Sequence, residues 1–596
     1  MISDRLAQRK AEVGARRATL SAFQREKLDE LLRQSERAPA QVIPRRPREE
    51  ENPLSFAQER LWFLDQLEPG SIAYNMCTPF RITGRLNVTA LKQSIDETVR
   101  RHESLRTTFV SGDGQPVQVI SPSRDLELPI VDISSFPETE REAVAQRLIR
   151  EGSDRAFDLA NGPLLRTVLL RLGEADHILL MSLHHIIFDE WSMQVLIRDA
   201  AEIYSTFADG EPSLLPELPI QYADFAHWQR EWLTGNVLEK ELSYWRQQLH
   251  DSPPSLNLPF DRPHTGAINP KAETVSISVP EFVAEGLMDL TQSARTTIFM
   301  TLLASLQILL ARYSGSDDIP VGTPVAGRRW LETEGMIGFF VNTLVIRTKL
   351  SSDPTIREVL RRVREVVLEA QTHQELPFAK LVEELRPGRN LSRGPLFQVM
   401  FTFQNRQKKA VTLPGMTVGI AEARNSTAKF DLSLDMAQAD GRIYGSFEYN
   451  AELFERSTID RLVRHYNAIL AAMAGNPDQR ISEIEILSDA ERRQLLSDWN
   501  DTFVDYPPEQ RIHELFEKRV AELPSALALV SGDEQISYGE LNHRADQLAH
   551  YLRSLGVGPE TRVGVMMERS VEMVVALFGI LKAGGAYVPL DPEYPQ

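Results

Sequence analysis

The sequence predicts an α/β fold that is divided over more than one domain. At 596 residues the chain is too long for a single hydrophobic core and suggests roughly two to four domains. Between residues 117 and 184, apolar runs typical of strands alternate with longer runs typical of helices, and this rhythm returns in the second half. The apolar content of 42% and the charged content of 25% are those of an ordinary globular protein.

The first 52 residues are charged and mixed in character. From Leu20 to Ser35 the apolar side chains recur at helical spacing, which predicts an amphipathic helix. That helix either packs on its own domain or docks another polypeptide, and the pattern favours neither. Residues 38–52 carry three prolines and a run of charges, so we interpret residues 1–52 as a helical docking or linker segment.

Beyond residue 53 the expected elements follow one another at short intervals. Ser55 is placed to cap a helix that runs to Leu64. The uncharged run from Thr296 to Ala311 predicts a buried helix, because it is shorter than the ~20 apolar residues that cross a membrane. The other expected elements are strands at 117–120, 126–131, 164–172 and 177–184, helices at 138–157, 192–207 and 239–249, and a proline-rich crossover at 253–263.

Residues 181–193 hold the side chains best suited to chemistry. A buried strand delivers two adjacent histidines, and a carboxylate stands four positions after the second of them. This arrangement suits proton transfer or polar stabilisation in a dry cleft. From spacing alone, a histidine that is satisfied inside the core is about as good an interpretation. The polar and aromatic residues concerned are His184, His185, Asp189, Glu190 and Trp191.

The same residues resemble the His-His-x-x-x-Asp-Gly core motif of condensation domains of nonribosomal peptide synthetases, with Glu190 in place of the glycine. Six further stretches resemble the other motifs of that family, in the family's order, between residues 55 and 396. No single stretch is specific, but seven in order make a strong signal. The six are Ser55–Leu64, Arg101–Phe109, Tyr222–Trp228, Ile337–Leu344, His373–Phe378 and Arg389–Leu396.

The resemblance implies two lobes that are similar to chloramphenicol acetyltransferase and are set in a V. We expect the first lobe at 53–228, the second at 229–486 and a linker at 487–508. A tunnel between the lobes would receive two phosphopantetheine arms from carrier domains, and the chain itself would bind no cofactor and no metal. The implied reaction is attack of an aminoacyl amine on a donor thioester, which forms an amide bond.

The resemblance also assigns roles to individual residues. His185 would act as the general base, or would orient the amine and stabilise the tetrahedral intermediate, and the sequence does not decide between these. His184 belongs to the same catalytic motif, although we expect its ring to turn into the wall. Asp189 would pair with Arg328 and hold the loop rather than transfer a proton. We place Trp191, Asn342 and Ser392 on the tunnel wall or in its support.

Glu190 is the departure from the family pattern. Glycine gives backbone freedom and allows close approach, whereas glutamate adds bulk and negative charge. Three interpretations stay open. The side chain turns to the surface with little effect, or it reshapes the pocket for an unusual donor or acceptor such as a polyketide or fatty acyl chain, or the domain has lost condensation activity and serves as a platform.

A second family resemblance begins after the linker. The stretches 536–542 and 581–592 resemble the first two motifs of adenylation domains. The sequence ends at Gln596, before the glycine-rich phosphate loop of that family, so we expect residues 509–596 to be a partial adenylation domain that does not activate amino acids. No Gly-x-x-x-x-Gly-Lys-Ser/Thr motif occurs in the chain.

Charge and cysteine content narrow the partners. The formal charge of −18 and the isoelectric point near 5.3 argue against nucleic acid or an anionic membrane. One cysteine, Cys77, allows no internal disulfide, and the charged N-terminus is no signal peptide, so we expect a cytoplasmic monomer. No carrier attachment motif precedes Ser55. We therefore expect the donor on a carrier of a separate polypeptide, and adenylation and carrier domains of the same synthetase downstream.

Two related activities fit the motifs less well. Epimerisation domains share the two histidines but follow a carrier domain and are not followed directly by adenylation. Cyclisation domains replace the two histidines with aspartates. The alternative from a different class is a catalytically silent domain that recruits carriers or tailoring enzymes; His185 argues against it and Glu190 argues mildly for it.

Overall fold

The computed structural model describes residues 42–47, 51–112, 115–123, 125–253, 255–263, 270–385, 396–405, 411–413, 415–421, 427–505 and 510–593. The expected helix Leu20–Ser35 and the candidate residue Ser392 lie outside these ranges. The chain forms two compact units, which divide between Ser488 and Asp489.

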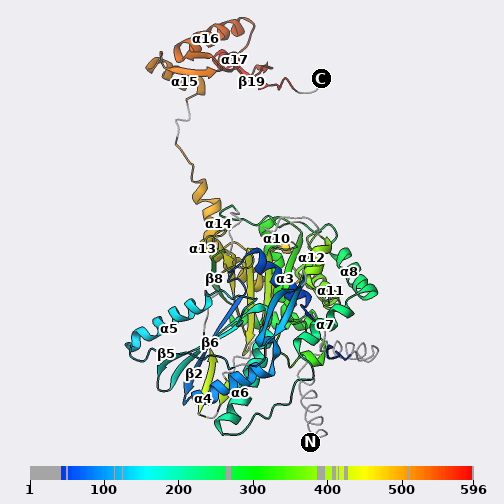
Figure 1. Cartoon of the computed structure of the whole chain (residues 1–596). Helices are drawn as coiled ribbons and strands as arrows, with labels where there is room; N and C mark the ends of the chain where they lie inside the picture. The colour runs from blue at the N-terminus through cyan, green and yellow to red at the C-terminus, as the bar shows by residue number, and fades with distance from the viewer. Residues whose placement is uncertain are drawn as a thin grey trace. The chain divides into compact units, whose positions relative to one another are not determined.

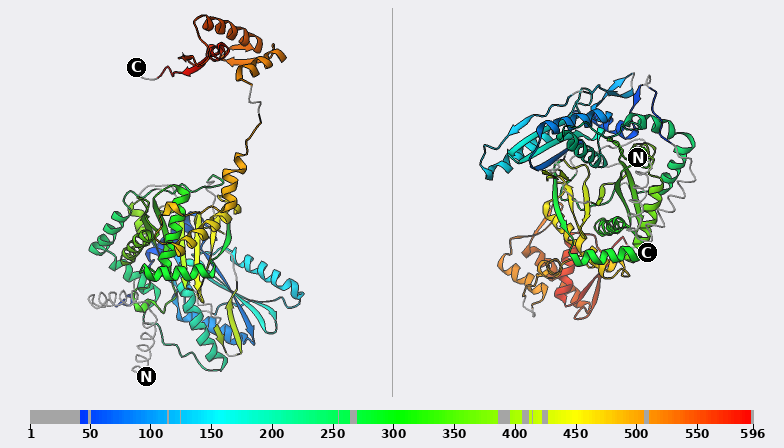
Figure 2. Two further views of the ribbon diagram at one scale, coloured as in Figure 1. Left: turned by 180° about the vertical axis from the view of Figure 1, so that it is seen from behind. Right: turned by 90° about the horizontal axis from the view of Figure 1, so that it is seen from below.

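The first unit is built on two six-stranded sheets, one in each of two lobes (Figure 1). Seen from below in Figure 2, the blue and cyan elements of the first lobe lie on one side and the green and yellow elements of the second on the other. The predicted α/β fold with two lobes is therefore confirmed. The first lobe's sheet has the order β12 (Val411–Leu413), β13 (Met416–Ile420), β2 (Asn75–Gly84), β7 (Asp176–His184), β6 (Leu165–Gly173) and β5 (Ile130–Asp132).

Several helices of the first lobe begin at side-chain caps. Ser55 accepts a hydrogen bond from the Gln58 N–H, and the Gln58 side chain accepts one from the Ser55 N–H, so the predicted cap is present. The same part of the chain also forms a small antiparallel sheet with the order β1 (Asn52–Pro53), β4 (Gln115–Ile120) and β3 (Thr107–Gly112). The helices are α3 (Phe56–Leu67), α4 (Val88–Arg101), α5 (Glu138–Ser153), α6 (Glu190–Ala208) and α7 (Tyr222–Trp232), with the 3₁₀ turns η1 (Glu103–Arg106) and η2 (His185–Ile187).

The second lobe repeats the plan of a six-stranded sheet packed with helices. Its sheet has the order β10 (Asn342–Lys349), β9 (Asp318–Val325), β11 (Val399–Asn405), β14 (Leu432–Ala439), β15 (Arg442–Asn450) and β8 (Ala272–Ser278). The helices are α8 (Gly235–Gln248), α9 (Glu281–Ser293), α10 (Ile298–Ser314), α11 (Ile356–Thr372), α12 (Phe378–Leu385) and α13 (Arg456–Gly475), with the 3₁₀ turns η3 (Leu331–Thr333) and η4 (Ile481–Glu483). Helix α10 is buried from Met300 to Leu310, as its lack of charge predicts.

A crossover ties the lobes together. Strands β12 and β13 follow β11 of the second lobe in the chain, yet β13 pairs antiparallel with β2 of the first lobe. Figure 1 shows these yellow-green strands beside β2. The lobe boundary expected between residues 228 and 229 does not account for this crossover, because β13 returns to the sheet of the first lobe. Helix α7 also crosses that boundary and ends at Trp232.

Local side-chain contacts shorten two expected elements. The strand expected at 126–131 is formed only at Ile130–Asp132, because Asp96 and Thr167 bind the backbone of residues 126 and 127 in place of a neighbouring strand. The helix expected to reach residue 157 ends at Ser153, whose carbonyl accepts from the Asn75 side chain.

Two expected linkers contain packed or regular structure. Ile43, in the segment that we interpreted as a linker, is buried with Tyr222 in a small core cluster. Arg46 of the same segment pairs with Glu103 and Asp224. The expected linker at 487–508 includes the helix α14 (Asp489–Leu496) and the turn η5 (Asp498–Asn500). Proline and charge patterns predict irregular backbone better than they predict freedom from packing.

After α14 and η5, the second unit forms a small α/β fold. A core of Phe516, Ile536, Leu541 and Val571 joins three helices and a hairpin. The buried Lys582 ammonium donates to Glu517, Asn542 and Asp546. The remaining elements are α15 (Ile512–Glu522), β16 (Leu527–Ser531), β17 (Glu534–Ser537), α16 (Tyr538–Ser554), β18 (Arg562–Val565), α17 (Val571–Ala583) and β19 (Ala586–Pro589).

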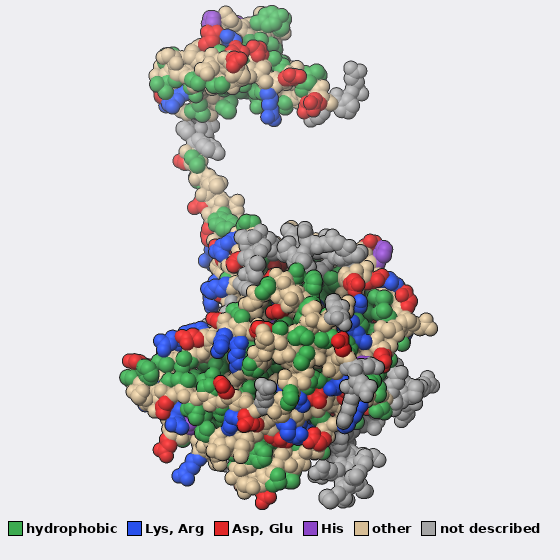
Figure 3. All heavy atoms as spheres, in the orientation of Figure 1, with side chains coloured by type: hydrophobic (Ala, Val, Ile, Leu, Met, Phe, Trp, Pro, Cys, Tyr) green, Lys and Arg blue, Asp and Glu red, His purple; other side chains and the backbone are tan. Residues whose placement is uncertain are grey.

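On the face of the first unit in Figure 3, acidic and basic side chains are interspersed. Among the described residues, no single helix is both long enough and apolar enough to cross a membrane. Helices α9 and α10 together meet that test by length and composition only, and they are bent by 107°.

Candidate active site

The two histidines lie where β7 leaves the sheet. His184 is the last residue of β7 and pairs with Asn75 of β2, so that Tyr74 stands opposite His185. The His185 N–H donates to the Tyr74 carbonyl at 2.9 Å, and the chain then turns through η2. Because β7 is a buried central strand, its end delivers both rings to the same edge of the first lobe.

The hydrogen bonds of His185 fix its tautomer. Nδ1 lies 2.6 Å from the Phe188 carbonyl oxygen, which can only accept, so Nδ1 carries the proton. Among the described residues we find no partner for Nε2, which therefore carries a lone pair. The ring is half-buried and contacts the edge of Phe339, with ring centroids 4.9 Å apart. Burial, helped by the positive charge of Lys429, lowers the pKa of His185 to about 3.

His184 is held more tightly. Its Nδ1 accepts the backbone N–H of Ile186 at 3.2 Å, and the residue is 4% exposed. The rings of Tyr74 and Phe157 lie 6.5 and 6.1 Å from its ring. Burial lowers the pKa of His184 to about 3, so this ring is also neutral at pH 7.

Asp189 caps α6 and receives four hydrogen bonds. Oδ1 accepts from the Ser192 N–H at 2.8 Å, from the Ser192 hydroxyl at 2.7 Å and from Arg328 Nη2 at 3.0 Å. Oδ2 accepts from the Phe340 N–H at 2.9 Å. The side chains of Asp189 and Arg328 are 3% and 1% exposed. The predicted pairing of Asp189 with Arg328 is confirmed.

Arg328 extends this contact into the second lobe. Its Nη1 donates to the carbonyls of Thr333 and Met336, and its guanidinium lies 4.0 Å above the ring of Phe340. Burial lowers the pKa of Arg328, and the charge of Asp189 opposes that change. The pair therefore fastens the beginning of α6 to the segment that precedes β10.

Residues 336–340, which we call the clamped segment, are held almost entirely by first-lobe side chains. Ser192 Oγ accepts the Gly338 N–H at 3.0 Å, and the Tyr222 hydroxyl donates to the Phe339 carbonyl at 2.5 Å. A Cβ on Gly338 would lie 2.0 Å from the Tyr222 ring, so only glycine fits there. This clamping places Phe339 against His185.

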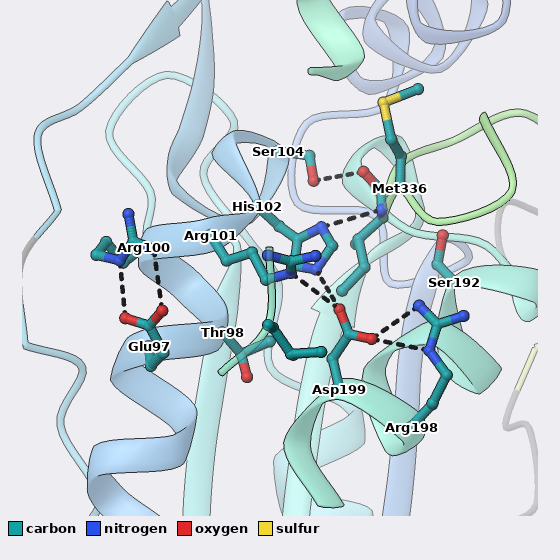
Figure 4. A network of polar contacts seen from close by, with 12 residues as sticks. Glu97, Thr98, Arg100, Arg101, His102, Ser104, Ser192, Arg198, Asp199 and Met336 are labelled. Carbon is teal, nitrogen blue, oxygen red and sulfur yellow. Dashed lines mark hydrogen bonds and ion pairs between the residues drawn. The ribbon is translucent and has the colours of Figure 1, made fainter. Parts of the chain in front are cut away.

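A buried charge network supports the other side of the clamped segment (Figure 4). His102 Nδ1 accepts the Ile337 N–H at 3.3 Å, and its Nε2 therefore donates to Asp199 at 3.1 Å. Arg101 and Arg198 donate to the same carboxylate. Burial opposes ionisation of Asp199, but the hydrogen bonds from His102 and Arg198 leave its pKa lowered. The Arg101–Phe109 motif thus supports the site.

The remaining candidate residues lie around this framework. Glu190 is exposed in the first turn of α6 with helical backbone, so glutamate fits there without strain. Trp191 is 38% exposed and donates to the Glu334 carbonyl at 3.0 Å. Asn342 donates to the carbonyls of Gln374 and Leu376 and accepts the Phe378 N–H, so it holds the His373–Phe378 motif in place.

Three contributors to this framework were not singled out from the sequence. Ser192 and Tyr222 bind the clamped segment, and Lys429 lies close enough to His184 and His185 to lower their pKa. The Tyr222 motif was recognised, but nothing in spacing connects residue 222 with residue 339. Within the described residues, no group of His, Cys, Asp and Glu side chains could hold a metal ion.

The family model of the condensation domain matches residues 48–496, about three quarters of the chain. The chain belongs to the condensation-domain family. The model of AMP-binding enzymes matches residues 516–596, so the start of an adenylation domain follows the condensation domain. Condensation domains of nonribosomal peptide synthetases form amide bonds between substrates on phosphopantetheine arms, and they work with carrier and adenylation domains.

The condensation domain has many curated relatives among peptide synthetases. One of the linear gramicidin synthase proteins from Brevibacillus parabrevis is 48% identical over 91% of this chain and 11% of its own length. Chondramide synthase cmdD from Chondromyces crocatus is 45% identical over 95% and 14%. Phosphinothricin tripeptide synthetase PhsC from Streptomyces viridochromogenes is 39% identical over 98% and 54%. The chain thus spans only part of each relative.

Solved structures agree with this family. The X-domain from teicoplanin biosynthesis is 30% identical with a TM-score of 0.69, covering 75% of this chain and all of that one. A four-domain nonribosomal peptide synthetase bound to AMP and glycine has a TM-score of 0.74 over 92% of this chain and 42% of that one. At 24% identity the latter likeness shows the fold alone.

Proposed function

We propose that this condensation domain joins a donor acyl or peptidyl thioester to the α-amine of an aminoacyl thioester, with His185 at the reacting centre. The observation that carries the proposal is the free lone pair on Nε2 of a neutral, half-buried imidazole. An acceptor α-amine has a pKa near ~8, so a useful fraction is already neutral at pH 7. What it needs is orientation and an acceptor for its proton.

His185 supplies that acceptor. The amine nitrogen attacks the thioester carbon, its proton passes to Nε2, the C–S bond breaks, and the departing sulfur takes the proton. Because burial makes imidazolium unfavourable, Nε2 acts as a hydrogen-bond acceptor or as a short-lived proton carrier rather than as a resting base. Positioning of the two tethered reactants can itself supply on the order of 7 to 11 kcal/mol at best.

The other motif residues support His185 without touching the reacting atoms. Asp189 is saturated by hydrogen bonds and paired with Arg328, and His184 spends Nδ1 on a backbone N–H. We assign all three to positioning. Trp191 and Asn342 hold loops on the second lobe in the same way.

A second function has its own supporting observation. The X-domain with which this chain shares 30% identity has also been solved in complex with OxyB, an example of the same fold bound to another protein. A recruiting domain without catalysis is therefore the alternative. The helical backbone at residue 190 favours catalysis over it, because glutamate causes no strain there.

Reconstitution tests both functions. The full chain is mixed with a donor carrier loaded with octanoyl, glycyl or phenylalanyl groups and an acceptor carrier loaded with glycyl, alanyl or leucyl groups, and products are identified by mass spectrometry. We expect amide product that falls by at least about a hundredfold in His185→Ala. Equal yields from wild type and His185→Ala would contradict the proposal, and product from no pair would favour the recruiting domain.

Delivery of the donor on a separate polypeptide stays a prediction. It is tested by supplying the donor carrier as an independent protein in the same reaction. Product formed without any covalent link between the donor carrier and this chain would support it.

A further inference from the structure

Lys429 reaches from the second lobe to the residue that anchors His185. It lies shortly before β14, and its Nζ stands 5.3 Å from the ring centroid of Tyr74 in the first lobe. The Tyr74 carbonyl accepts the His185 N–H at 2.9 Å, and the Tyr74 ring is 6.5 Å from that of His184. The ammonium is thus held beside the element that carries both histidines.

Lys429 is accessible to solvent, and protein also surrounds its ammonium. The residue is exposed, yet surrounding protein lowers the pKa of the ammonium through burial. Both observations fit a side chain that lines an internal, water-accessible space. Among the described residues it makes no hydrogen bond or ion pair at short range. The charged groups that act on it are Glu448, which raises its pKa, and Arg60, which lowers it.

That ammonium also acts on the histidines. It disfavours protonation of His185, and it does the same for His184, because a positive charge repels a second one nearby. In the described part of the chain, Glu448 is the anion that raises the pKa of Lys429. Burial lowers that pKa by more, so the pKa of Lys429 stays lowered.

We propose that Lys429 is a positioning residue for the condensation, which holds a positive charge over Tyr74 and before His185. There it adds to the effect of burial in keeping the imidazole neutral, so that Nε2 accepts a hydrogen bond from the amine. The same charge favours the negative oxygen that develops when the amine attacks the thioester carbon. This role rests on the proposed function of His185, and it adds a residue outside the His-His-x-x-x-Asp motif.

The first test measures His185 itself and does not depend on activity. The full chain is labelled with ¹⁵N-histidine, and His185 is assigned with His185→Gln. We expect wild-type His185 to be neutral down to about pH 5, and Lys429→Glu to raise its midpoint by about two pH units, so that roughly half is protonated there. His185 that stays neutral at about pH 5 in a folded Lys429→Glu variant would overturn the proposal.

A matched control separates this effect from a general loss of charge. Lys380 is also held near an aromatic ring, with its Nζ 5.6 Å from the centroid of Phe56, but it does not act on either histidine. Lys380→Glu should therefore leave His185 neutral over the same range. If Lys380→Glu shifts His185 as much as Lys429→Glu does, the local role of Lys429 is wrong.

The second test measures the chemical step. With a carrier pair that reacts with wild type, single-turnover amide formation should fall about tenfold or more in Lys429→Met and recover in Lys429→Arg, which restores the charge. Equal rates in all three would overturn the role in condensation. If no carrier pair reacts with wild type, the proposed function fails, while the titration of His185 still decides whether Lys429 controls it.

Discussion

Replacement of Asp189 by alanine is the sharpest test of how the site is assembled. The change removes four hydrogen bonds and leaves the guanidinium of Arg328 without its counter-charge, with its side chain only 1% exposed. Breaking a buried ion pair from one side costs about 3 to 5 kcal/mol. The clamped segment should open more easily by that amount, which corresponds to roughly two to three and a half powers of ten in the opening equilibrium.

Hydrogen exchange followed by mass spectrometry measures this opening locally, which suits a chain of several domains. We expect faster exchange in peptides that cover residues 186–195 and 334–342, together with lower amide yield. Asp318→Ala is the matched control, because it breaks the Arg347–Asp318 pair (2.6 Å) between β9 and β10. That variant should loosen its own strands and leave residues 186–195 protected.

A double variant refines the same test. Arg328→Met in the background of Asp189→Ala removes the stranded charge, and exchange of the clamped segment should slow toward the wild-type rate. Unchanged exchange in Asp189→Ala would refute the structural account of this pair. Full protection combined with lost activity would instead assign Asp189 a direct part in the chemistry.

Three further outcomes follow from the geometry. The pKa values of His184 and His185 are about 3 in the folded chain and near ~6.5 in the unfolded chain, so between these values only the unfolded chain binds the two protons. The free energy of unfolding should therefore fall by about 1.4 kcal/mol per pH unit for each histidine as the pH drops from about 6.5 toward 3. Urea titrations measure this fall, and its slope with pH should become smaller when either histidine is replaced by Gln. Glu190→Gly should change the rate of amide formation by less than about threefold and lower the stability of α6 by about 1 kcal/mol. A much larger change in rate would mean that the glutamate reaches the substrate. Gly338→Ala, whose Cβ would lie 2.0 Å from the Tyr222 ring, should destabilise the clamped segment by about 1 to 3 kcal/mol in thermal unfolding, whereas an unaffected melting temperature would show that the ring can move aside.

Much of the fold could be read from periodicity and capping. The buried run of β7, the uncharged α10 and the Ser55 cap are local patterns, and each forms the expected element. The exact ends of helices and strands were harder to predict, because contacts with residues distant in the sequence set them. Asn75 captures the end of α5, and Asp96 takes the backbone that would have extended β5.

The sequence by itself determined the family, through seven motifs in order, and it predicted that the two histidines follow a buried strand and that Asp189 pairs with Arg328. Only the tertiary structure decided which nitrogen of His185 carries the lone pair, that Ser192 and Tyr222 clamp the segment bearing Phe339, and that Lys429 stands over Tyr74. The physical reason is range. Strand period, helix caps and motif spacing are set by neighbours in the chain, whereas the clamping of Phe339 and the charge near His185 depend on residues of two lobes more than 100 positions apart.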